Sequence, residues 1–173
     1  MGKFKDITFF KRIIANIPIL LLFISVLNEF DFNYLEIKFF AFNFPFILIF
    51  YWSLKKTEVL GYGYIFIAGL INDVVIGFPI GISSFCYLLI CGFAAYLKNI
   101  TLRPSLLKDW LFFLFTILAT NSIMYSLLVL FFGFEINYNK LLINLSFTFL
   151  LYILFAYIFD MYHKLVFGRT NDW

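Results

Sequence analysis

Long apolar runs, separated by short breaks that are polar or contain glycine and proline, follow one another along almost the whole chain. Several of these runs approach the roughly 20 apolar residues that a helix needs to cross the hydrocarbon core of a bilayer. The breaks define six runs, which we predict to be six transmembrane helices in one integral membrane domain covering residues 1–173. The predicted spans are 9–28, 39–55, 59–76, 81–98, 109–133 and 141–163.

The composition supports this fold class. Of the 173 residues, 64% are hydrophobic and only 13% are charged, so a soluble domain of this size would leave much apolar surface in water. We therefore predict an all-α membrane protein, folded as a six-helix bundle. The predicted loops are short and leave no room for a soluble catalytic domain.

The lysines and arginines predict how the bundle is oriented, because basic residues concentrate on the cytoplasmic side of a membrane. If the N-terminus is cytoplasmic, eleven of the thirteen basic residues fall on that side, and only Lys38 and Lys140 fall outside. Six spans then place both termini in the cytoplasm. We interpret the net charge of +3 as a sign of this orientation and of contact with anionic lipid headgroups, and not of nucleic-acid binding. The eleven are Lys3, Lys5, Lys11, Arg12, Lys55, Lys56, Lys98, Arg103, Lys108, Lys164 and Arg169.

The segment from Gly69 to Gly81 carries the strongest functional signal. It places Asn72 and Asp73 near the outer end of the third span and follows them with a Gly-x-Pro-x-Gly turn. An ionisable residue at membrane depth is costly and marks a candidate functional site. We expect Asp73 to orient the turn or to accept hydrogen bonds from a partner helix; the alternative is a solvated carboxylate at headgroup level.

Other polar residues are scattered in the sequence but map to the same outer half of the membrane, because successive spans alternate in direction. They form a candidate polar cluster with three interpretations: an outward-opening cavity, hydrogen bonds between helices, or the lower cost of polar groups near an interface. The cluster consists of Asn43, Ser83, Ser84, Asn144 and Ser146.

The residues present do not favour an enzyme. His163 is the only histidine, and no nucleophile, Walker or zinc-protease motif occurs. Cys86 and Cys91 lie about 140° apart on a helix, so they are unsuited to bridge each other or share a metal. We predict no catalytic residue, cofactor or metal site. Trp52, Trp110 and Trp173 lie near predicted inner interfaces and are interpreted as anchors there.

The order of these features resembles the MreD family, small membrane proteins of the bacterial rod-shape system. The resemblance rests on a basic N-terminus, Pro18 in the first span, Phe44-Pro45 leading to Tyr51-Trp52, and the Gly69–Gly81 motif. The family pattern is Gly-Leu-x-x-Asp followed by Gly-x-Pro-Leu-Gly, and Ile80 replaces the leucine. The matching motif residues, taken as candidate partner-binding residues, are Gly69, Asn72, Asp73, Gly77, Pro79 and Gly81.

The resemblance implies a bacterial inner-membrane protein with a fold similar to the substrate-binding subunits of energy-coupling-factor vitamin transporters. It also implies a non-enzymatic scaffold that partners MreC and, through it, the MreB filament and the RodA–transpeptidase synthase of peptidoglycan. One alternative is a vitamin-binding transporter subunit, but the Ala-x-x-x-Ala docking patch of those subunits does not occur in this sequence. A small lipid-modifying enzyme is a second alternative, for which no converging pair of acidic or histidine side chains is evident.

Overall fold

The computed structural model of the chain describes residues 16–27, 42–100, 105–135 and 137–167. These residues form helices joined by turns, with no strand among them. The all-α prediction is therefore confirmed for the described part of the chain. The helices are α2 (Ile17–Leu27), α3 (Phe44–Leu60), α4 (Tyr62–Ile76), α5 (Ile82–Ile100), α6 (Leu106–Phe132) and α7 (Tyr138–Phe167).

Each described helix overlaps one predicted span, and α3 to α5 begin and end within about five residues of it. By length and composition, three helices could cross a membrane: α5, α6 and Tyr138–Val166 of α7. The shorter apolar helices are α2 and α4. The full count of six spans stays a prediction. Residues 9–15 of the first span, the acidic 29–38 loop with Lys38, and Arg103, Arg169 and Trp173 lie outside the described residues.

Local sequence explains where the helices begin and end. Pro45 lies in the first turn of α3, where the missing N–H costs no helical hydrogen bond. Ser105 caps α6 by accepting a hydrogen bond from the Lys108 N–H. Gly133 ends α6 in the left-handed conformation, with φ of 65°, which glycine adopts without steric cost. Asn137 accepts from the Lys140 N–H and so begins α7.

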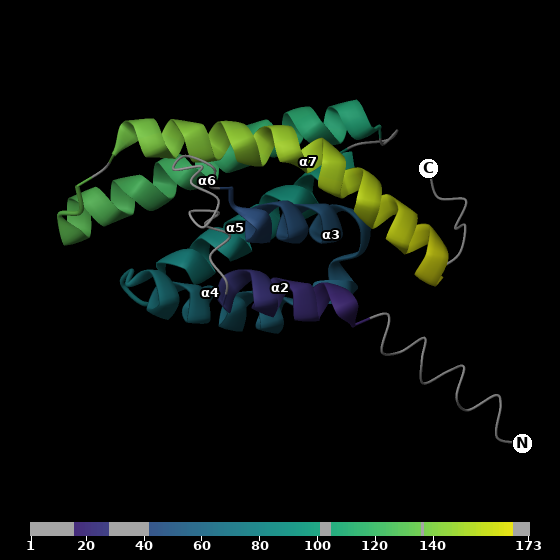
Figure 1. The fold of residues 1–173 in the computed structure, drawn as a ribbon, viewed down its shortest axis with the longest axis horizontal. Coiled ribbons are helices and arrows are strands. Elements are labelled where there is room, and N and C mark those ends of the chain that lie inside the picture. The colour runs from purple at the N-terminus through teal and green to yellow at the C-terminus, as the bar shows by residue number, and fades with distance from the viewer. Residues whose placement is uncertain (1–15, 28–41, 101–104, 136, 168–173) are drawn as a thin grey trace, which may run out of the picture.

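Helix α3 is the centre of the bundle. It packs against α2, α4, α5 and α7, and every residue from Phe44 to Ser53 is buried. This part of α3 is apolar on nearly all sides, as a helix must be if neighbours surround it. Figure 1 shows α2 and α4 on one side of α3 and α5, with α6 and α7 on the other side.

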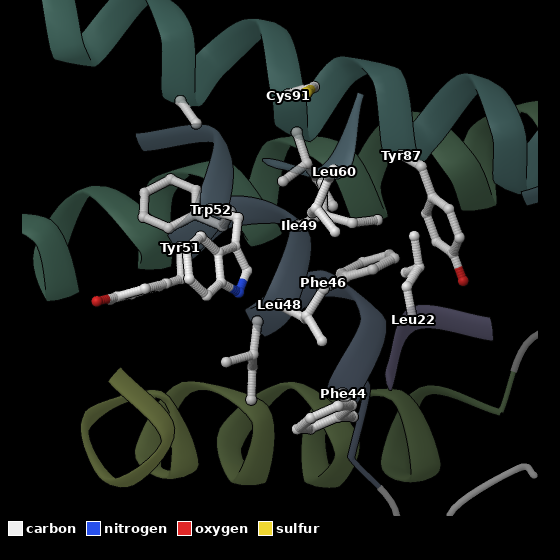
Figure 2. Packing of buried hydrophobic residues seen from close by; sticks show 14 of the residues in the cluster. Leu22, Phe44, Phe46, Leu48, Ile49, Tyr51, Trp52, Leu60, Tyr87 and Cys91 are labelled. Atoms are coloured by element: carbon white, nitrogen blue, oxygen red, sulfur yellow. The ribbon is translucent and has the colours of Figure 1, made fainter. Parts of the chain in front are cut away.

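Aromatic side chains of α3 fill the core, as Figure 2 shows. Phe50 lies against Phe113 of α6 and Tyr152 of α7, with ring centroids 5.1 and 5.7 Å away. Trp52 is fully buried and its ring contacts Tyr162 of α7. The interpretation of Trp52 as an interface anchor is therefore wrong, because the surrounding helices enclose the indole ring.

The α4–α5 turn and the α6–α7 turn lie at one end of the bundle, which we call the turn end. Phe78 of the α4–α5 turn and Phe134 of the α6–α7 turn meet edge to face, with centroids 5.8 Å apart. The first residues of α2 and the last residues of α7 lie at the opposite end, on the right in Figure 1. At that end Lys55 of α3 approaches Asp109 of α6, with 3.9 Å between Nζ and Oδ2.

Candidate functional site

The Asp73 carboxylate holds the α4–α5 turn together. Its Oδ2 accepts a hydrogen bond of 2.7 Å from the Gly81 N–H, and its Oδ1 accepts one of 2.9 Å from the Ser83 N–H. The side chain is 0% exposed. A solvated Asp73 is thus excluded, and the carboxylate orients the turn, which is one of the roles expected for it.

These two bonds also place the Asp73 carboxylate in a favourable electrostatic position relative to the two helix dipoles. Asp73 belongs to the last turn of α4, where a negative charge is unfavourable, but its oxygens lie at the first N–H groups of α5. The N-terminus of a helix carries unpaired N–H donors and a partial positive charge. The carboxylate therefore caps the next helix, and the sequence separation of eight to ten residues is spanned by the turn.

Two glycines give the turn its shape. Gly77 ends α4 in the left-handed conformation, with φ of 76°, and its N–H donates to the Asp73 carbonyl. Gly81 adopts φ of 106°, a backbone conformation that side chains disfavour. Between them, the Phe78 N–H also donates to the Asp73 carbonyl at 2.9 Å. Asp73 thus ends α4 with its backbone and begins α5 with its side chain.

Helices α4 and α5 approach closely behind the turn. A Cβ atom on Gly69 would lie 2.4 Å from the Ser84 Cα, so only glycine fits there. The Ser84 hydroxyl donates to the Phe66 carbonyl at 2.9 Å, and Asn72 Nδ2 donates to the Ser83 hydroxyl at 2.9 Å. Five polar contacts or close approaches therefore hold one seam between α4 and α5, which we call the Asp73 seam.

The candidate polar cluster is divided between the Asp73 seam, the contact of the segment before α3 with α7, and the exposed surface of α7. Ser83 and Ser84 belong to the Asp73 seam, whereas Asn43 and Asn144 meet at Thr148 of α7. The Thr148 hydroxyl accepts from the Asn43 N–H at 2.9 Å and donates to the Asn144 carbonyl at 2.7 Å. Ser146 is exposed on α7, beside an apolar groove. These contacts favour hydrogen bonds between neighbouring segments over one shared cavity.

Thr148 is not among the residues predicted from the sequence, although it joins the segment before α3 to α7. We predict that Thr148→Val, which keeps the shape and removes the hydroxyl, lowers the free energy of unfolding by about 1–2 kcal/mol, because the Asn43 N–H loses its acceptor. Unfolding of the purified protein in mild detergent measures this. Thr116→Val is the control. It removes a hydroxyl that donates to the Phe112 carbonyl within α6, so it should change stability less.

The turn presents apolar side chains beyond the seam. Ile80 at its apex is 76% exposed, while Phe78 packs on Phe134. Beneath it, Ile82 and Cys86 of α5 form a small core with Met124 and Leu128 of α6. The turn is therefore fixed from inside by Asp73 and from one side by the α6–α7 turn, and it leaves an apolar apex uncovered.

Comparison with known proteins gives one family match. The family model of the rod shape-determining protein MreD matches residues 11–166. The chain belongs to the MreD family. The resemblance drawn from the Gly69–Gly81 motif is confirmed, and the match covers every described helix apart from the last residue of α7. No curated protein and no solved structure matches the chain.

Membership in the MreD family makes the chain a membrane protein of the rod-shape system, with a structural, shape-determining role. The vitamin-transporter alternative gains no support from the match. The family model does not assign roles to single residues, so partner binding by Gly69, Asn72, Asp73, Gly77, Pro79 and Gly81 stays a prediction.

Proposed function

We propose that the chain is a non-enzymatic scaffold of the cell-elongation machinery in the bacterial inner membrane. It partners an MreC-like membrane protein and, through it, the MreB filament and the RodA–transpeptidase synthase that builds peptidoglycan. The observation that carries the proposal is the MreD family match over residues 11–166. We further propose six spans, both termini in the cytoplasm, and a fold like that of energy-coupling-factor substrate-binding subunits.

The turn end supports a docking role for the motif. The Asp73 carboxylate is fully buried and satisfied within the chain, so it has no free face to offer a partner. Ile80, in contrast, is held on a braced turn and is largely exposed. A rigid apolar apex loses little conformational entropy on binding. In this proposal Asp73 and the glycines shape the turn, and the apex touches the partner.

Affinity purification from native membranes in mild detergent, followed by mass spectrometry, tests the scaffold function. Recovery of MreC-, RodA- or transpeptidase-like proteins is the expected result. Recovery of paired ATPases with a coupling membrane subunit would contradict it and make the chain a transporter's substrate-binding subunit.

Ile80→Asp tests the apex itself. We predict that this variant inserts and unfolds like the unchanged protein, because the side chain is exposed and has no partner to lose. Recovery of the MreC-like partner should fall about tenfold or more, since a charge in an apolar interface costs over 1.4 kcal/mol. Leu130→Asp, at an equally exposed position in the last turn of α6, is the matched control. Equal recovery with both variants would remove the apex from the proposed interface.

A further inference from the structure

The outward face of α4 is apolar, with exposed side chains near both ends of the helix and the half-buried Leu70 and Ile71 between them. Its exposed side chains are between 39% and 69% exposed, and the only acidic or basic residue of the helix, Asp73, is buried in the seam. Such a face suits lipid chains. The exposed side chains are those of Tyr62, Tyr64, Phe66, Ile67, Val74, Val75 and Ile76.

The helical backbone is interrupted at both ends of α4. At its N-terminal end, α4 follows the exposed Glu58 and then Gly61, which has φ of 66°. On the other side Gly77 begins the turn. Backbone without helical hydrogen bonds is not tolerated where lipid chains surround it. If α4 crosses the membrane, both breaks therefore mark headgroup level, and the two tyrosines near Gly61 are placed as interface residues.

The distance between these breaks is shorter than a bilayer. Helix α4 has 15 residues, which span about 22 Å at a rise of 1.5 Å per residue. The hydrocarbon core of a typical bilayer is about 30 Å thick. Tilting shortens the span of a helix across the membrane, so no orientation of α4 closes the difference of about 8 Å.

The opposite side of the bundle has no such mismatch. Lys140 and Asp160 of α7 are separated by about 30 Å of helix, and exposed apolar residues follow one face between them. Figure 1 places α7 and α4 on opposite sides of α3 and α5. A long helix can also tilt to fit a thinner membrane, whereas a short one cannot lengthen. Only the α4 side therefore requires the bilayer to adapt.

We infer that lipid covers the α4 face and that the bilayer is locally thinner there than around α7. The inference rests on the proposed topology, in which α4 crosses the membrane. The occupant is lipid because the face is continuously apolar and ends in tyrosines. A transmembrane helix of a partner would need the full bilayer thickness and would extend beyond both ends of this face.

Spin labels measure the depth of both ends of α4. Single cysteines replace Tyr62 and Ile76 on α4 in the full-length protein, reconstituted in dioleoyl phosphatidylcholine vesicles. Tyr62→Cys and Ile76→Cys are compared with Leu142→Cys and Leu165→Cys on α7, and collision with oxygen or a nickel chelate reports depth. The unlabelled parent checks that the buried Cys86 and Cys91 do not react.

We expect each α4 label to lie within about 2 Å of the hydrocarbon boundary on its side of the membrane. In a bilayer of full thickness, the depths of the two labels inside the hydrocarbon would sum to about 8 Å, and that result overturns the inference. Low collision rates with both reagents would also overturn it, because protein would then cover the face. These readouts need no partner, so they are independent of the proposed scaffold function.

Lipid chain length gives a second measurement. Thermal unfolding is compared in phosphatidylcholine vesicles with monounsaturated chains of 14, 18 and 22 carbons. The midpoint should be highest with the 14-carbon lipid and fall as the chains lengthen, since mismatch at α4 grows with thickness. A midpoint that stays level or rises with chain length contradicts local thinning.

Discussion

Gly69→Ala is expected to separate α4 from α5 and to lower the free energy of unfolding by about 3 kcal/mol. The added Cβ would lie 2.4 Å from the Ser84 Cα and 2.5 Å from the Ser84 nitrogen. These are backbone atoms, so no rotamer change can relieve the clash, and overpacking of this kind typically costs about 1–3 kcal/mol or more. The separation should also stretch the Ser84–Phe66 hydrogen bond.

Unfolding of the purified variant by SDS in mixed micelles measures the effect. Gly92→Ala is the matched control, because Gly92 also lies in an apolar helix but a Cβ there meets nothing within 4 Å. Alanine is the better helix former by about 1 kcal/mol, so this control should be neutral or slightly stabilising. If both variants lose stability equally, close packing at Gly69 is not the cause.

The seam around Gly69 shows what the sequence predicts well. The break between the third and fourth apolar runs predicted α4 and α5 and the turn between them, because Gly77 and Gly81 are needed where the backbone adopts positive φ. The role of Asp73 in orienting the turn followed from its place near the end of an apolar run. The close approach of Gly69 to Ser84 did not follow, because it depends on how the two helix faces are rotated.

The polar cluster shows where depth alone misleads. Asn144 and Ser146 lie at similar depth on α7, but two residues rotate a helix by about 200°, so their side chains point to opposite sides. One contacts Thr148, and the other is exposed. The prediction that Trp52 is an interface anchor is wrong for the same reason. Its position near a predicted interface does not indicate which helices enclose its side chain. The sequence predicts a depth for each residue, whereas the direction in which its side chain points depends on how the helices pack.

Asp73→Ala is the second large effect, and it separates the shape of the turn from the presence of the helices. The variant removes both acceptors of the Gly81 and Ser83 N–H groups. A buried donor left unpaired costs about 1–3 kcal/mol, and loss of a helix cap costs about 0.5–2 kcal/mol. We expect stability to fall by about 3 kcal/mol while the protein still inserts, because the apolar spans are unchanged.

The consequence for assembly follows from the same bonds. Without the carboxylate the apex is no longer held, so recovery of the proposed MreC-like partner should fall together with stability in Asp73→Ala. Asp73→Asn keeps one acceptor oxygen and should lie between the two proteins in both measurements. Ile80→Asp, in contrast, should lose the partner without losing stability. If Asp73→Ala unfolds normally, co-purifies normally and supports normal cell shape, the turn does not depend on this carboxylate, and Asp73 has no part in the scaffold.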